Sequence, residues 1–128
     1  MSGKNTGRSE ITDALLAAMN DTTADIHVHV SERRWERNIY RRALAWFHFY
    51  RLQDTRQKNA VLIYLNTRSH RFAIVADDGL THFLNKSYWD ELGGCFREDL
   101  QSTQFERAVA LTLRTLGVTL QKYFPRNL

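Results

Sequence analysis

Two apolar runs separated by a polar turn lie near the middle of the chain. The runs are Ala60–Leu65 and Phe72–Ala76, and the turn between them is Asn66–Arg71. Both runs are rich in β-branched and aromatic residues and are too short to be typical helices, so they predict a β-hairpin with buried strands. The second run leads directly into the acidic turn Asp77-Asp78-Gly79. Strand ends often carry the functional side chains of α/β proteins, so this turn is the first candidate for a site.

The patterns on either side of the hairpin predict one more strand and four helices. Alternating apolar residues predict a strand at Ile26–Val30, which presents His27 and His29 on the face opposite Ile26. Apolar residues spaced by about four and seven positions predict helices at Ser9–Asn20, Arg33–Leu52, Tyr88–Gln101 and Phe105–Tyr123. Trp35 is expected on the buried stripe of the second helix, and Thr81–Leu84 as a short extended piece.

The order of these elements predicts an α/β fold. One β-α-β crossover followed by a hairpin makes a small mixed sheet, and helices are expected on both of its faces, as in a three-layer α/β/α sandwich. Residues 1–8 are expected to form a disordered tail, and residues 9–128 a single domain. A chain of 128 residues that is 43% hydrophobic is long and apolar enough to bury a core of this kind.

The chain shows no segment typical of membrane insertion or secretion. It has no run of about 18 apolar residues, and its first residues, MSGKNTGRSE, lack the apolar centre of a signal peptide. The single cysteine, Cys95, cannot form an internal disulfide and is expected to be a small core residue. These features predict a cytoplasmic protein.

The positive charge is concentrated in one segment. The whole chain carries a net charge of +4, whereas the segment from Ser31 to Ala60 holds eight basic and three acidic residues and hence a net charge of +5. Five arginines of this segment fall on the predicted second helix and form the candidate partner-binding surface: Arg33, Arg34, Arg37, Arg41 and Arg42. Such a surface suits an acidic protein, anionic lipid headgroups or nucleic acid. An ordinary solvated helix face has the same pattern.

Asp77 and Asp78 are candidate ligands for a hard divalent cation. Adjacent carboxylates offer the oxygen atoms that Ca²⁺ and Mg²⁺ prefer, and Gly79 permits a sharp turn that would aim them. Asp25 and Asp90 are the candidate third and fourth ligands, provided that the strand ends converge. A full calcium cage takes about six to eight oxygens, so backbone carbonyls and water would supply the rest. The alternative is a structural turn in which an aspartate caps backbone N–H groups.

The sequence does not identify a catalytic residue. A metal-assisted phosphatase needs a metal-bound water and positive charge for the developing anion, and Asp77 or Asp78 could supply the metal ligand. The chain contains no P-loop, no G-x-S-x-G and no C-x5-R motif. His27 and His29 share a strand face, but zinc takes four ligands, so an exposed or helix-covered strand face is the better interpretation.

Several segments, taken in order, resemble the TPM domain family, a Rossmann-like α/β module. Thr22–Val30 resembles the family's opening strand, Asn59–Tyr64 resembles its N-G-V-L-I-Y element, and Phe72–Leu80 resembles F-A-I-x-G-D-x-G-I. The final Phe124-Pro125 is similar to the closing F-P of the family. The resemblance extends over most of the chain and implies the fold predicted above.

The resemblance also implies a kind of function. Members of the family support the assembly or maintenance of photosynthetic or respiratory membrane complexes, some bind calcium or magnesium, and the plant type is credited with a weak acid phosphatase activity. Most members carry a signal peptide and an anchor, so this chain resembles the soluble, stand-alone type found beside anchored relatives in some bacteria. We therefore expect an accessory binding module whose partner is a protein, either a membrane complex or an anchored relative. A weak metal-assisted phosphatase and a nucleic-acid binder are the alternatives.

Overall fold

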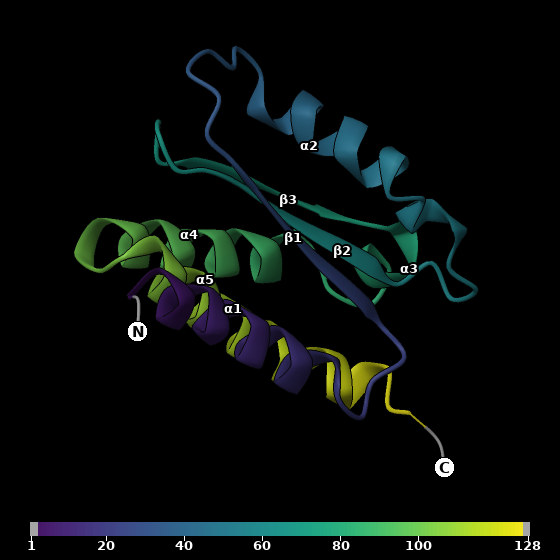
Figure 1. Cartoon of the computed structure of the whole chain (residues 1–128). Helices are drawn as coiled ribbons and strands as arrows, with labels where there is room; N and C mark the ends of the chain where they lie inside the picture. Colours follow the sequence, from purple (N-terminus) through teal and green to yellow (C-terminus); the bar gives the residue numbers. More distant parts are fainter. Residues whose placement is uncertain (1–2, 127–128) are drawn as a thin grey trace. The chain divides into compact units, whose positions relative to one another are not determined.

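The structure of the chain, a computed structural model, describes residues 3–126, with side chains described from Glu10 onward. Its elements are α1 (Gly3–Met19), β1 (Asp25–Ser31), α2 (Ile39–Phe49), the 3-10 turn η1 (Leu52–Asp54), β2 (Ala60–Asn66), β3 (Arg71–Ala76), α3 (Asp78–Thr81), α4 (Lys86–Ser102) and α5 (Phe105–Tyr123) (Figure 1). The fold is α/β with a mixed three-stranded sheet, as predicted. The chain forms two compact units: a sheet unit, Ala24–Leu84, and a helical unit, which joins the chain up to Thr23 to the chain from Asn85.

The sheet has the order β1-β2-β3, with β1 parallel and β3 antiparallel to β2. The predicted hairpin is confirmed as β2 and β3, and the register of β1 places His29 opposite Tyr64. Every residue of the central strand β2 is buried, as expected of a continuous apolar run. Asn66 ends β2, and its Oδ1 accepts hydrogen bonds from the backbone N–H groups of Arg68 and Ser69 at 2.9 and 3.1 Å, which stabilises the turn into β3.

Helix α2 packs on one face of the sheet and closes an apolar core (Figure 1). Ala43 and Phe47 are its buried residues, and residues four apart lie on one side of a helix. They pack with buried side chains of the strands, Leu62, Tyr64, Ala73 and Val75. Burial of an aromatic side chain such as Phe47 contributes about 1.5–3 kcal/mol to folding.

Helix α2 starts at Ile39, so the prediction of a helix from Arg33 to Leu52 is wrong at its beginning. Asn38 has extended backbone angles, and its Oδ1 accepts a hydrogen bond from the backbone N–H of Arg41 at 2.9 Å, which caps the helix. The residues before Asn38 form a loop. Trp35 lies in this loop and is 82% exposed, so its expected place in the core is also wrong.

The structure also differs from the predicted elements at the end of α2, at Thr81–Leu84 and at the start of α1. Helix α2 ends at Phe49 because Arg51 adopts a left-handed conformation, with a φ angle of 58°. The segment Thr81–Leu84, expected to be extended, instead contains the end of α3 and a turn, because Asp77 caps a short helix there. Helix α1 begins at Gly3 rather than Ser9.

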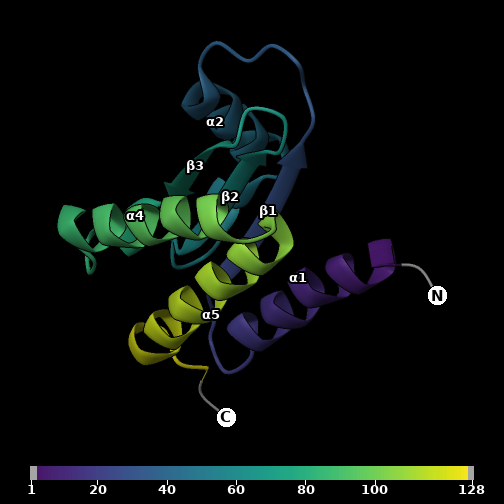
Figure 2. The ribbon, with the colours of Figure 1, turned by 90° about the vertical axis from the view of Figure 1, so that its left-hand side faces the viewer.

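In the helical unit α1 lies beside α5 (Figure 2). Gly117 of α5 permits this close approach, because a Cβ at its position would lie 2.7 Å from the Cα of Ala18. The chain leaves α1 through Thr22, which is buried and whose hydroxyl lies 3.1 Å from the carbonyl oxygen of Leu120 and 2.6 Å from that of Phe124. Helix α5 has the predicted bounds, and α4 is slightly longer than predicted.

Candidate functional site

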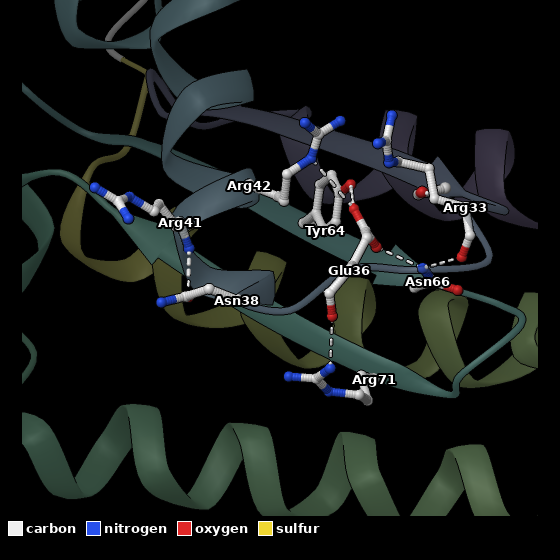
Figure 3. Close-up of polar contacts among 9 residues, drawn as sticks. Arg33, Glu36, Asn38, Arg41, Arg42, Tyr64, Asn66 and Arg71 are labelled. Atoms are coloured by element: carbon white, nitrogen blue, oxygen red, sulfur yellow. Dashed lines mark hydrogen bonds and ion pairs between the residues drawn. The ribbon is translucent and has the colours of Figure 1, made fainter.

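Glu36 lies in the loop between β1 and α2, and its carboxylate is buried, with the side chain 2% exposed. The hydroxyl of Tyr64 donates a hydrogen bond to Oε2 at 2.5 Å, and the side-chain amide of Asn66 donates one to Oε1. The Nε atom of Arg42 lies 3.4 Å from Oε2 and forms an ion pair with it. Figure 3 shows the carboxylate enclosed by these three side chains, which come from the central strand and from α2.

The charge of Glu36 follows from this environment. Burial by itself raises the pKa of a carboxyl group because it disfavours the charged form. The hydrogen bonds from Tyr64 and Asn66 and the charges of Arg42 and Arg33 outweigh burial and lower the pKa of Glu36 below its ordinary value. Burial and the bond to Glu36 raise the pKa of Tyr64. At neutral pH, Glu36 is therefore an anion that accepts from a neutral phenol.

The same network fixes the backbone of the loop (Figure 3). Arg71 donates a hydrogen bond to the carbonyl oxygen of Glu36 at 2.9 Å, and the amide of Asn66 donates one to the carbonyl oxygen of Arg33 at 3.0 Å. The loop is thus anchored on both sides of Trp35. Its anchored conformation leaves the Trp35 ring in solvent, where it is the most exposed large apolar side chain of the described residues.

The five predicted arginines differ in their position relative to α2 and in whether they contact Glu36. Arg33, Arg34 and Arg37 precede α2, so the expectation that all five lie on one helix is wrong, whereas Arg41 and Arg42 lie in it. Arg42 and Arg33 stabilise the charge of Glu36. The other three arginines are exposed, and within residues 3–126 their side chains form no hydrogen bond or ion pair. We call these three and the tryptophan among them the arginine surface: Arg34, Trp35, Arg37 and Arg41.

A cluster of aromatic rings lies beside the Glu36 network. The ring of His29 stacks on Trp46, with centroids 4.1 Å apart, and on Tyr64, with centroids 5.2 Å apart. Its Nδ1 lies 2.9 Å from the hydroxyl oxygen of Tyr50. Burial lowers the pKa of His29, and the charge of Glu36 offsets part of this effect. His29 is therefore a neutral ring packed under α2, as expected of a helix-covered strand face.

Phe49 extends this cluster to the molecular surface. Its ring meets the edge of Trp46 at a centroid distance of 5.1 Å and is itself 72% exposed. A shallow hollow of about 250 Å³ lies between these rings and the side chains of Arg42 and Ala45. Exposed aromatic rings therefore flank α2 at both ends, Trp35 before its first turn and Phe49 at its last position.

Sequence reasoning missed the residues that organise this surface. It counted Glu36 only as one of the three acidic residues of the basic segment, and it assigned no role to Tyr64 or Asn66. One signal was present: asparagine is a favoured N-cap residue, so Asn38 indicates a helix that begins after it and leaves Glu36 in the preceding loop.

Asp77 is the N-cap of α3. Its Oδ1 accepts a hydrogen bond from the backbone N–H of Asp78 at 2.8 Å, which is the capping role expected of a structural turn. Its Oδ2 is buried and has no hydrogen-bond partner in the described part of the chain. Gly79 serves close packing rather than a sharp turn, because a Cβ there would lie 2.2 Å from the carbonyl oxygen of Gln57. An unpartnered carboxylate oxygen is one that a cation or a water molecule would satisfy.

The other candidate metal ligands are dispersed. Asp25 pairs with Ala60, and the backbone N–H of Asp77 donates to the carbonyl oxygen of Ala60 at 3.0 Å, so both aspartates lie at one end of the sheet. They flank β2 and are about 10 Å apart, twice the strand spacing. Asp90 lies on α4, where its Oδ2 is 2.7 Å from the Nζ of Lys86. Between residues 3 and 126, no three His, Cys, Asp or Glu side chains are grouped so that they could hold a metal. The four-aspartate site therefore stays a prediction.

Cys95 is exposed on α4, so its expected place in the core is wrong. It lines a groove between α4 and α5 with a volume of about 560 Å³. The groove combines apolar side chains, such as Leu92, with three carboxylates, Glu91, Glu98 and Asp99, and one arginine, Arg114. Its charge is opposite to that of the arginine surface.

Comparison with known proteins agrees with the sequence resemblance. The family model described as the TPM domain matches residues 4–118. Among solved structures, the chain is similar to the BA42 protein of the psychrophilic bacterium Bizionia argentinensis, determined by NMR, with 26% identity and a TM-score of 0.87. The match covers 95% of this chain and 83% of that one.

The family assignment rests on the match to the TPM domain model and on the similarity to the BA42 structure. No curated protein matches the chain. None of the helices within residues 3–126 has the length and apolar character needed to cross a membrane. The family match covers most of the sequence, and the solved relative shares its fold over nearly the whole chain. The chain therefore belongs to the TPM domain family.

Proposed function

We propose that the chain is an accessory binding module that docks an acidic partner protein through the arginine surface. The observation that supports this function is the buried Glu36 carboxylate, which anchors the loop so that Arg34, Trp35 and Arg37 project outward without partners of their own. The network that holds the loop is separate from the side chains that the loop displays.

The composition of the arginine surface suits a protein interface. Tryptophan and arginine are the residue types that most often dominate binding energy at the centre of an interface. A loop that is already ordered loses less conformational entropy on binding than a mobile one, so more of the contact energy contributes to affinity. The anchors at Arg33 and Glu36 supply this order before a partner arrives.

Nucleic acid is a weaker candidate for the partner. Single-stranded binders stack successive bases on exposed aromatic rings along a positive groove. Here Trp46 and Tyr64 are already stacked on His29, and Arg42 is paired with Glu36. If nucleic acid were the partner, its affinity would fall steeply with rising salt concentration.

The proposal is tested by cross-linking in cells that express the tagged chain, followed by identification of the linked proteins. The double variant Arg37→Glu/Arg41→Glu reverses two charges of the arginine surface whose side chains form no hydrogen bond or ion pair within the described residues. A matched control, Arg56→Glu/Lys122→Glu, reverses two exposed charges elsewhere. We expect partners with acidic cross-linked segments to be lost from the first variant and retained by the control. Recovery of the same partners with both variants would contradict the proposal.

We propose a weak divalent-cation site at Asp77 as a second function. It is supported by the buried Oδ2 atom of Asp77, which lacks a hydrogen-bond partner in the described residues. The ion, calcium or magnesium, would take this oxygen with the carboxylate of the adjacent Asp78, and backbone carbonyls or water would complete its shell. When bound, it would supply positive charge at the end of the sheet.

An amide NMR titration with calcium and then magnesium tests the cation site. We expect chemical-shift changes confined to Ala76–Leu80 at millimolar metal, and their loss in the Asp77→Asn variant. The same variant would abolish any turnover of a phosphomonoester, the alternative activity. An unchanged spectrum at the highest metal concentration of the titration would leave Asp77 with its capping role alone.

A further inference from the structure

The groove between α4 and α5 has the properties of a docking site for an apolar group flanked by cations. Leu92 is buried, and Leu111 is partly exposed at the groove. Around these apolar side chains stand the carboxylates of Glu91, Glu98 and Asp99, against a single arginine. A groove of about 560 Å³ is large enough to admit an aromatic side chain.

The complementary group is present on the same chain. Trp35 is an apolar ring that is 82% exposed, and Arg34 and Arg37 lie on either side of it in the sequence. The acidic groove belongs to the helical unit and the arginine surface to the sheet unit. Two surfaces with opposite charge and matching apolar centres therefore occur on one molecule.

The spacing of the charges is compatible with two ion pairs. Glu91 and Glu98 are seven residues apart on α4, which is about 10.5 Å along a helix. Arg34 and Arg37 are three residues apart in a loop, which is at most about 11 Å of extended chain. This upper limit exceeds the separation of the two glutamates along α4, so the length of the loop is compatible with simultaneous contacts of Arg34 and Arg37 with Glu91 and Glu98.

We propose that the chain associates with a second copy of itself, Trp35 of one molecule entering the α4–α5 groove of the next. Arg34 and Arg37 then face Glu91 and Glu98. This inference rests on the proposed function and identifies its acidic partner as another copy. Because the two contact surfaces differ, the contact is head-to-tail and leaves one surface and one groove open at the ends of a dimer.

Two variants block the two halves of the contact separately. Trp35→Ala removes the inserted ring and keeps the groove, whereas Glu91→Arg/Glu98→Arg reverses the charge of the groove and keeps the ring. These sites are solvent-accessible, and circular dichroism verifies that each variant is folded. Arg56→Glu/Lys122→Glu is the control that changes charge outside both surfaces.

Sedimentation velocity over a range of concentrations gives the test. Wild type and control should show a mass that rises with concentration, and each blocked variant alone should be monomeric, with self-affinity at least about 30-fold weaker, as for loss of a hot-spot tryptophan. An equimolar mixture of the two blocked variants should form a dimer and nothing larger, because only one productive contact remains. A mixture that stays monomeric would overturn the proposal.

A wild-type chain that stays monomeric at its highest attainable concentration would also overturn it. Binding of that monomer to vesicles of phosphatidylcholine and phosphatidylserine would then assign the arginine surface to anionic lipid. A monomeric wild-type chain would not contradict the proposed function, because cellular cross-linking through Arg37 and Arg41 is measured independently of self-association.

Discussion

The hydroxyl of Tyr64 donates a hydrogen bond to the carboxylate of Glu36 at 2.5 Å and so joins the central strand of the sheet to the loop that carries the arginine surface. The carboxylate has lost nearly all contact with water, and its charge is stabilised by protein groups instead. The bond can form only when β2 and the loop have come together. Folding of the sheet unit and the conformation of the loop are therefore coupled.

Replacement of Glu36 by glutamine should destabilise the sheet unit. The variant keeps the size of the side chain but leaves Arg42 without its counter-ion. The expected loss is about 2 kcal/mol of unfolding free energy. This loss is smaller than that for a fully buried ion pair because Arg42 is partly exposed. Urea unfolding at neutral pH measures it. Glu32→Gln, at an exposed neighbouring position, should change stability by less than about 0.5 kcal/mol. Equal effects of the two substitutions would contradict the role of the network.

The contribution of Glu36 should depend on pH in acid. Its pKa is lower in the folded chain than the ordinary value of 4.5, so the unfolded chain takes up the proton first as the pH falls. The contribution is complete above the ordinary pKa and is lost as the pH falls through the folded-state pKa. The stability difference between wild type and Glu36→Gln should therefore be constant near neutrality and decrease in acid. A difference that persists unchanged below the folded-state pKa would mean that charge is not its source.

The sequence predicted those elements whose apolar pattern lies within a single short segment of the chain. The apolar runs of β2 and β3 predicted the hairpin because a central strand is apolar on both faces. The second helix shows where this reasoning failed. Its apolar spacing continues back to Trp35, but Asn38 caps the helix and the Glu36 network holds the preceding chain in a loop. The capping residue is visible in the sequence, whereas the partners of Glu36 come from a distant strand.

The candidate sites were harder to predict, because they depend on which strand ends meet. Asp77 and Asp25 were placed correctly at strand ends, and both flank Ala60. The capping bond of Asp77 and its unpartnered oxygen depend on the path of α3, which the sequence did not reveal. Cys95 was expected in the core because cysteines are usually buried, but it faces the groove of α4 and α5.

Trp35 and Phe47 should respond oppositely to truncation. Trp35→Ala should change the free energy of unfolding by less than about 0.5 kcal/mol, because the ring is 82% exposed. Phe47→Ala removes a buried ring of the α2 core and should cost about 3–5 kcal/mol. Urea unfolding of both variants distinguishes the observed loop from a helix that buries Trp35. A large loss of stability in Trp35→Ala would favour the helix.

The stacked His29 ring should make stability depend on pH near neutrality. Burial lowers its pKa from the ordinary value of 6.5, so the unfolded chain binds a proton at higher pH than the folded chain. Stability is highest above this ordinary value and falls as the pH decreases from it toward the folded-state pKa. His29→Phe retains a ring against Trp46 and should flatten this part of the profile, measured by urea unfolding across that range. His48→Phe, at an exposed position, should keep the wild-type dependence of stability on pH. A flattened dependence in this control would mean that His29 is not the source of the effect.

Two glycines inside helices of the helical unit should give opposite results when each is replaced by alanine. At Gly94 a Cβ would meet nothing within 4 Å, so the better helix propensity of alanine should raise stability by about 0.5–1 kcal/mol. At Gly117 the Cβ would lie 2.7 Å from the Cα of Ala18, and separating α1 from α5 should cost about 1–3 kcal/mol despite the same propensity gain. Because the chemical change is identical, propensity alone cannot produce a difference in sign. Thermal unfolding of the two variants measures it, and stabilisation by Gly117→Ala would show that α1 and α5 do not pack at this distance.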